Sequence, residues 1–147
     1  MSLWEWTLEA YGQPGVPEAC LALQDEHGQN TSLLLWAVWA EAGAPALLAR
    51  AAEAAHRWED VALVPLRAVR RALKAPAPPV ADDAREALRE DVKAAELRAE
   101  RVLMETLEAM GGRGGGAHAL AALEAASKAW GKPAPANALA ALAAALG

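Results

Sequence analysis

The sequence predicts an all-α protein, a compact bundle of about six to eight helices that includes one long, charged, amphipathic helix. Hydrophobic residues make up 54% of the 147 residues, and Ala and Leu supply most of them. Phe is absent, so six Trp and one Tyr provide all the aromatic bulk. Because Ala and Leu favour helices whereas β-branched and aromatic residues favour strands, this composition points away from sheets. The length suits one domain with a buried core.

Gly and Pro residues divide the first half of the chain into five short helices. Ser2 is suited to cap the first, Pro17 lies in the first turn of the second, and Gly28 ends it. Any residue of the segment 30–32 could cap the third, which is expected to run to Gly43. The five helices are expected at about residues 3–11, 17–27, 31–43, 45–58 and 61–74.

The third helix contains the most apolar stretch of the chain, LLLWAVWA at residues 33–40. This stretch is apolar on every side, which predicts a central helix buried all round. Trp36 and Trp39 are therefore expected in the core, and Cys20 on the second helix is expected to be a small buried hydrophobe.

A Pro-rich linker at residues 75–81 precedes the longest periodic segment, residues 82–110, which Asp82 or Asp83 could cap. Apolar residues recur along it at three- and four-residue steps and form one seam: Leu88, Val92, Ala95, Ala99, Val102 and Thr106. Such a helix is ~45 Å long, whereas a compact domain of this size is roughly 38 Å across. The helix should therefore project from the globule, bend, or lie against a second copy.

The segment GGRGGG at residues 111–116 ends the long helix and is expected to be a flexible hinge. Two Ala-rich helices follow, at about residues 117–130 and 136–147. The sequence thus predicts a helical domain over residues 1–111, with its linker at 75–81, and a Gly/Ala-rich helical tail over residues 112–147.

The helix at 61–74 concentrates positive charge in a chain whose formal net charge is −5. Its four cations fall within an arc of about 100° at helical spacing, and Leu66, Val69 and Leu73 occupy the opposite face, which is expected to be buried. The cations are Arg67, Arg70, Arg71 and Lys74.

Four like charges this close need an anionic counterpart. One interpretation is internal pairing, with Glu96 and Glu100 of the long helix, or Asp25 and Glu26 of the second helix, as the opposing stripe. The other is that the stripe binds an anionic partner, such as an acidic protein surface, a phosphorylated ligand or a membrane surface. A solvated face without a role is the third possibility.

The turn LQDEHGQN at residues 23–30 gathers polar side chains between two helices. Turn and cap chemistry explains them, but Gln24, Asp25 and Asn30 could also line an inter-helix pocket for an anionic ligand. The three His residues are scattered and show no paired ligand spacing, so neither a metal nor a cofactor is expected. No catalytic motif is evident, and we expect no enzyme.

Compartment and partners follow from cysteine usage and charge. A single Cys excludes an internal disulfide and fits a reducing cytoplasm. The N-terminus has no basic start, and the longest apolar stretch is far short of the ~20 residues that span a bilayer. The negative net charge disfavours nucleic acid. We expect a cytoplasmic protein.

Four ordered pieces carry a resemblance to a known family: LWEWTLEAYGQPGVPEACLALQDEHG, LLLWAVW, VPLRAVRRALK and VKAAELRAE. Together they resemble a family of small proteobacterial, all-helical proteins catalogued only as a domain of unknown function. The resemblance spans about Leu3 to Leu107, and the tail after Gly111 lies outside it. It implies an α-helical cytoplasmic protein and brings no activity, cofactor or catalytic residue.

The sequence favours a non-enzymatic protein-interaction module, self-associating as a homodimer or binding an acidic protein surface. The Arg/Lys helix face or the seam of the long helix would form the contact. Two alternatives stay open: a small-molecule binder that takes an anionic or phosphorylated ligand between helices, and peripheral binding to an anionic membrane.

Overall fold

The computed structural model describes residues 1–147 and confirms the all-α prediction. Eight α-helices and one π-helical turn follow one another along the chain. They are α1 (Leu3–Tyr11), α2 (Val16–Asp25), α3 (Thr31–Ala40), α4 (Pro45–Trp58), η1 (Glu59–Leu63), α5 (Val64–Ala72), α6 (Asp82–Met110), α7 (Ala119–Trp130) and α8 (Ala136–Leu146). None of these helices is both long and apolar enough to cross a membrane.

Two helices begin with the caps that the sequence predicts, and two helix ends differ from the prediction. Ser2 forms a capping box with Glu5, and the Asn30 side chain accepts a hydrogen bond from the Leu33 amide (2.9 Å). The prediction of an aspartate cap on α6 is wrong, because Ala81 holds the cap position and both aspartates lie inside the first turn. α3 ends at Ala40, before Gly43, because Glu41 adopts a left-handed conformation (φ 54°).

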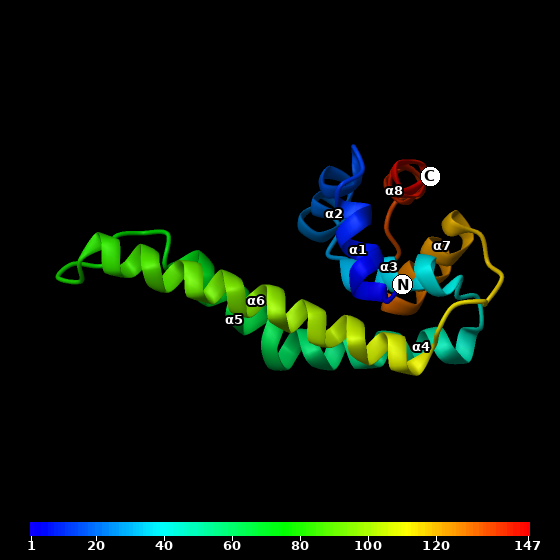
Figure 1. Ribbon diagram of the computed structural model, residues 1–147, viewed down its shortest axis with the longest axis horizontal. Helices are drawn as coiled ribbons and strands as arrows, with labels where there is room; N and C mark the ends of the chain where they lie inside the picture. The colour runs from blue at the N-terminus through cyan, green and yellow to red at the C-terminus, as the bar shows by residue number, and fades with distance from the viewer.

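α3 is the centre of the structure, as its uniform apolarity predicts. Eight of its ten residues are buried, and α1, α2, α4, α6 and α7 all pack against it. Trp36 is fully buried and donates its indole N–H to the Gly111 carbonyl (2.9 Å). Figure 1 shows α3 enclosed by its neighbours, with both chain termini on this globular part.

The C-terminal tail completes the core. Leu123 of α7 and Leu142 of α8 are both fully buried in the same hydrophobic cluster as α3. The Ser127 hydroxyl donates to the Gln29 side chain (2.7 Å), and the Trp130 indole donates to the Gly28 carbonyl (2.8 Å). The hydrophobic core therefore crosses the predicted division at residues 111 and 112.

The expectation of a flexible hinge at the Gly-rich segment does not match its packing. The Gly115 amide donates to the Ala40 carbonyl and the Ala117 amide to the Glu41 carbonyl, both at 3.0 Å. A Cβ added at Gly115 would lie 2.9 Å from the Ala40 carbonyl oxygen and closer still to that of Glu41. The segment needs glycine here because its backbone lies directly against the end of α3.

An arm projects from the globular part, formed by α5 and the first half of α6 (Figure 1). α4, η1 and α5 are one continuous helical stretch, since the residues at both ends of η1 stay right-handed helical. Pro65 lies at the start of α5 and has no amide N–H to donate to the preceding turn, which accounts for the π-helical turn there. The long helix projects as the size argument allowed.

Gly115→Ala should destabilise the fold by about 1–3 kcal/mol, because the added methyl group meets two backbone carbonyls that cannot move independently. Gly112→Ala is the matched control, since nothing lies within 4 Å of a Cβ at that position. Urea denaturation of both variants measures the difference. Equal stability of the two variants would contradict the close packing of this segment.

Candidate interaction surface on the projecting arm

The inner side of the arm is charged. The Arg70 Nε atom lies 2.5 Å from the Glu96 carboxylate, and Arg67 lies 3.8 Å from Glu59. All four side chains are largely shielded, with 14% to 24% of each exposed. Glu59 also accepts a hydrogen bond from the Asn30 side-chain amide (2.9 Å). The α5–α6 contact is therefore partly ionic: Arg70 and Glu96 form a hydrogen-bonded, partly desolvated pair across it, whereas Arg67 pairs with Glu59 of the preceding turn.

Glu100 is the third carboxylate of this charged cluster and makes no ion pair within 4.0 Å. Burial raises the pKa of Glu100, and Glu96 raises it further, although Arg67 acts in the opposite direction. Three carboxylates thus share two guanidinium groups. The cluster carries an excess of negative charge at Glu100.

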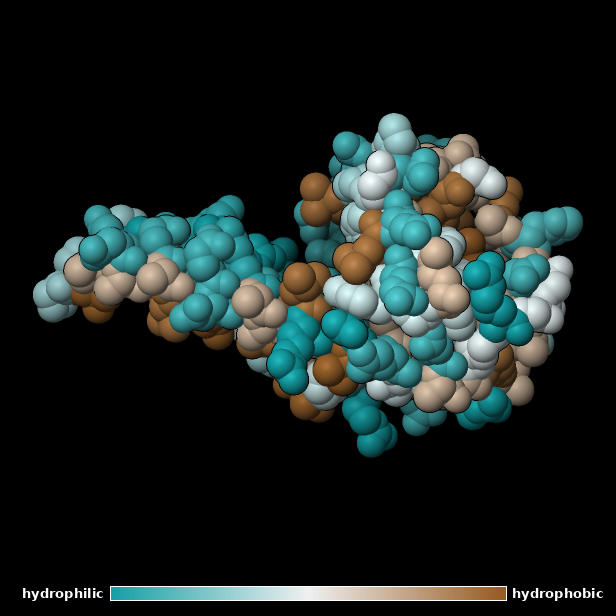
Figure 2. Space-filling view, in the orientation of Figure 1, coloured by the Kyte–Doolittle hydropathy of each residue, from teal (hydrophilic) through white to brown (hydrophobic).

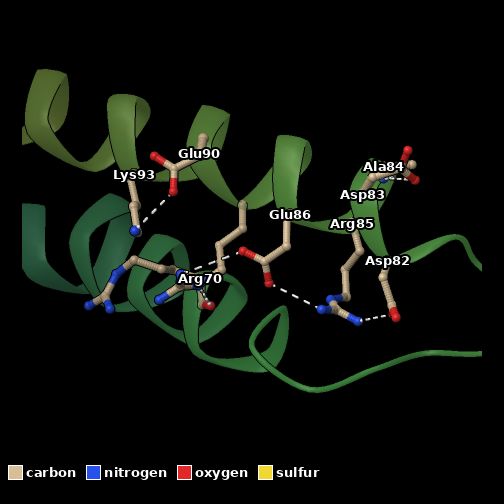
Figure 3. Close-up of polar contacts among 9 residues, drawn as sticks. Arg70, Asp82, Asp83, Ala84, Arg85, Glu86, Glu90 and Lys93 are labelled. Atoms are coloured by element: carbon tan, nitrogen blue, oxygen red, sulfur yellow. Dashed lines mark hydrogen bonds and ion pairs between the residues drawn. The ribbon is translucent and has the colours of Figure 1, made fainter.

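Further along the arm, basic residues of α6 hold its outer end. Arg85 is 8% exposed, and its guanidinium contacts Asp82 (2.6 Å) and Glu86 (3.1 Å). The Arg89 Nε donates to the Arg70 backbone carbonyl (3.4 Å), which ties α6 to α5. Figure 3 shows these charged side chains between and along the two helices.

The four cations of α5 do not share one environment. Arg67 and Arg70 are partly buried and paired with the cluster, whereas Arg71 and Lys74 are exposed and make no ion pair within 4.0 Å. Internal pairing, one of the three interpretations of the stripe, therefore accounts for half of it. Of the expected counter-ions, Glu96 pairs with Arg70 and Glu100 lies beside the cluster, whereas Asp25 and Glu26 pair with none of the four cations.

The expectation that α5 buries its leucine side is wrong. No residue of α5 is buried, Leu66 and Leu73 are half-buried, and Val69 is 47% exposed. The physical reason is orientation: Arg70 points toward Glu96 of α6, so Leu66 and Leu73 are only partly covered and Val69 lies on the exposed side of α5.

The apolar flank of the arm consists of apolar residues that α5 and α6 leave uncovered along one edge. On α6, Leu88 is 51% exposed and Val102 is 39% exposed, and Ala95, seven residues from each, lies in line with them. Figure 2 shows hydrophobic residues gathered along the lower edge of the arm. The exposed members of the flank are Val69, Leu88, Ala95 and Val102, and Leu73 and Val92 are half-buried beside them.

At the base of the arm, this flank runs into a groove of about 230 Å³ between α4 and α6. Ala54 and Trp58 line its α4 side, and Val102 and Thr106 line its α6 side. The Trp58 indole donates to the Ala99 carbonyl (2.8 Å) and fixes the ring against α6. The flank and the groove form one continuous apolar strip.

The polar turn between α2 and α3 does not gather its residues around one site. Asn30 is buried and committed to capping α3 and to Glu59, whereas Asp25 is exposed at the end of α2 and Gln24 is half-buried. Gln29, in contrast, is buried and binds the tail through the Lys132 carbonyl (2.7 Å). The turn's main structural role is to hold α3 and the tail.

Sequence reasoning missed Glu59, Arg85 and Arg89 as members of the arm's charged interior. Glu59 was placed between two separate helices, where its position relative to Arg67 could not be judged. A signal existed for Arg85 and Arg89: they lie four residues apart, and Glu96 follows seven residues later on the same face of α6.

Arg70→Ala should destabilise the protein by about 1–3 kcal/mol, because it leaves the shielded Glu96 carboxylate without its partner. The neighbouring Arg71→Ala should change stability by less than about 0.5 kcal/mol, since Arg71 is exposed and unpaired. Urea denaturation compares the two. If both substitutions cost the same, the ion pair does not hold the arm.

Glu100→Gln should stabilise the protein at neutral pH. A folded-state pKa raised above the unfolded value of 4.5 means that the folded chain binds the Glu100 proton more tightly. The stabilisation from this tighter proton binding is complete below pH 4.5 and is lost as the pH rises through the raised pKa. The amide avoids the loss, so the gain in melting temperature should appear at neutral pH and vanish below 4.5.

Glu53→Gln is the control for this comparison, since Glu53 is exposed on α4. The melting temperature of this variant should stay close to that of the wild type. A Glu100→Gln variant that is less stable than the wild type at neutral pH would show that attraction to the arginines outweighs burial.

Comparison with known proteins yields one family. The model of a family described as a protein of unknown function (DUF2390) matches residues 2–107. No curated protein and no solved structure matches the chain. The matched region includes the whole charged cluster and the apolar flank, and it ends before the Gly-rich segment and the tail helices. The family resemblance read from the sequence is thereby confirmed: the chain belongs to the DUF2390 family.

Proposed function

We propose that this protein is a non-enzymatic interaction protein that self-associates as a homodimer through the apolar flank of its arm. The observation that carries the proposal is the make-up of the arm: the Arg70–Glu96 ion pair lies between α5 and α6, and exposed apolar side chains of both helices line the outer edge. Helical hairpins ordinarily bury their apolar residues between the helices. An edge of this kind favours a partner that covers it.

A second copy of the chain fits this edge because the edge is self-complementary in charge. Asp91 and Arg98 border the line of Leu88, Ala95 and Val102, and both are exposed without an ion pair within 4.0 Å. If two α6 helices pack antiparallel about an axis near residue 94, each Asp91 meets Arg98 of the partner subunit. The two-fold symmetry forms this pair twice.

The same register gives Leu88 a place to insert. Residues 88 and 102 are about 21 Å apart along the helix, so the antiparallel arrangement carries Leu88 of one copy to the groove beside Val102 of the other. That groove is lined by Ala54, Trp58 and Thr106, and a leucine entering it resembles a knob packing into a hole. Apolar burial supplies the affinity, and the charged pairs fix the register.

The Arg/Lys face contributes less than the sequence suggested. Arg67 and Arg70 are already paired within the arm, and only Arg71 and Lys74 stay exposed for an acidic partner. The apolar flank needs no opposite charge from a partner, so it is the stronger candidate for the contact surface.

Light scattering on the purified chain should give a mass of twice 15.4 kDa. Leu88→Glu should reduce it to the monomer mass, because a charge would be buried in the groove of the partner subunit. Leu21→Glu is the matched control, since Leu21 is 59% exposed on α2 in the globular part, and this variant should stay dimeric.

Charge reversal tests the register directly. Asp91→Arg and Arg98→Asp should each weaken the dimer, because each creates like charges across the two-fold axis. The double variant should restore the dimer, since each charged pair re-forms with its two charges exchanged. A wild-type monomer at high concentration, or single reversals without effect, would contradict the proposed dimer.

A further inference from the structure

A pocket of about 240 Å³ lies between α1, the start of α3 and the middle of α6. Its walls are apolar and come from Trp4, Leu8, Leu97 and Met104. Leu8 and Leu97 are more than half exposed and form the rim. This pocket is on the side of α6 opposite the apolar flank, so it is separate from the proposed dimer contact.

Polar side chains line one part of the pocket, among them Tyr11 and Glu100. Thr7 also borders the pocket, but its hydroxyl oxygen is buried and does not open into it.

Charge decides which ligand suits these groups. Glu100 is the unpaired member of a cluster that contains three carboxylates and two guanidinium groups. The groups that face it are Glu96 on α6, Glu59 on η1 and the two arginines of α5, with Tyr11 on α1. An anionic ligand would add to the excess negative charge, whereas a cation would balance it.

We propose that this pocket binds a small primary amine with a compact apolar or aromatic body. The ammonium group has three N–H donors, and Glu100 and Tyr11 bring oxygen acceptors to the same pocket. The apolar walls contact the body of the ligand. The volume lies below the range of about 300–1,000 Å³ that is typical for drug-sized ligands, so the ligand is a smaller molecule.

Three probes that share one body separate head-group recognition from hydrophobic binding: 2-phenylethylamine, 2-phenylethanol and phenylacetate. Each is titrated into the ¹⁵N-labelled full chain, and the signals of the Trp4 indole and the Thr7 and Leu97 amides are followed. The amine should give saturable shifts at these positions. The alcohol and the acid should bind at least about tenfold more weakly than the amine, since neither forms an ion pair with Glu100.

Variants identify the groups responsible. Glu100→Gln should lower amine affinity about tenfold, to the level of the alcohol. Glu53→Gln, outside the pocket, should bind as the wild type does. The rest of each spectrum reports whether the variant is folded. The Leu88→Glu variant should bind the amine unchanged, which keeps this test independent of dimerisation.

Four outcomes would overturn the proposal. They are no saturable shift with the amine at millimolar concentration, equal affinity for the three probes, shifts confined to another part of the molecule, and unchanged amine affinity in a folded Glu100→Gln variant.

Discussion

The constraint on which the rest of the structure depends is the need to cover α3 on every side. A helix that is apolar all round is stable in water only when other elements surround it completely. Here α1, α2, α4, α6 and α7 pack against it, and Trp36 at its centre is held by the Gly111 carbonyl where α6 ends. The tail is drawn into the fold for the same reason, since α7 covers a side of α3 that the first 111 residues leave open.

Enclosing α3 uses only part of α6. Its second half contributes Leu103, Met104 and Leu107 to the core, whereas the first half extends beyond the globular part with α5 as its only neighbour (Figure 1). Two helices alone cannot build an apolar core of much depth. The Arg70–Glu96 ion pair joins the two helices of the arm, and several apolar side chains stay exposed along its edge.

Sequence patterns predicted the features that local chemistry controls. The burial of α3 follows from its composition, the Ser2 and Asn30 caps from their side chains, and the seam of α6 from its spacing. The patterns could not show which way the seam faces, because spacing defines a stripe but not what covers it. Glu59 was missed because η1 joins two helices that looked separate. The pocket was missed because Tyr11 and Glu100 lie far apart in the chain.

α6 carries both proposed surfaces, and its geometry keeps them apart. Leu88, Ala95 and Val102 fall on one side of the helix, and Leu97, Glu100 and Met104 fall on the other. Glu100 nevertheless connects the pocket with the interior of the arm, since it lines the pocket and lies beside the ion pairs of Arg67 and Arg70. A carboxylate that burial makes costly to keep charged is a common feature of binding sites, where a ligand supplies the counter-charge. A cation bound at Glu100 would therefore add positive charge to a cluster that is short of it, and would stabilise the base of the arm without touching the apolar flank.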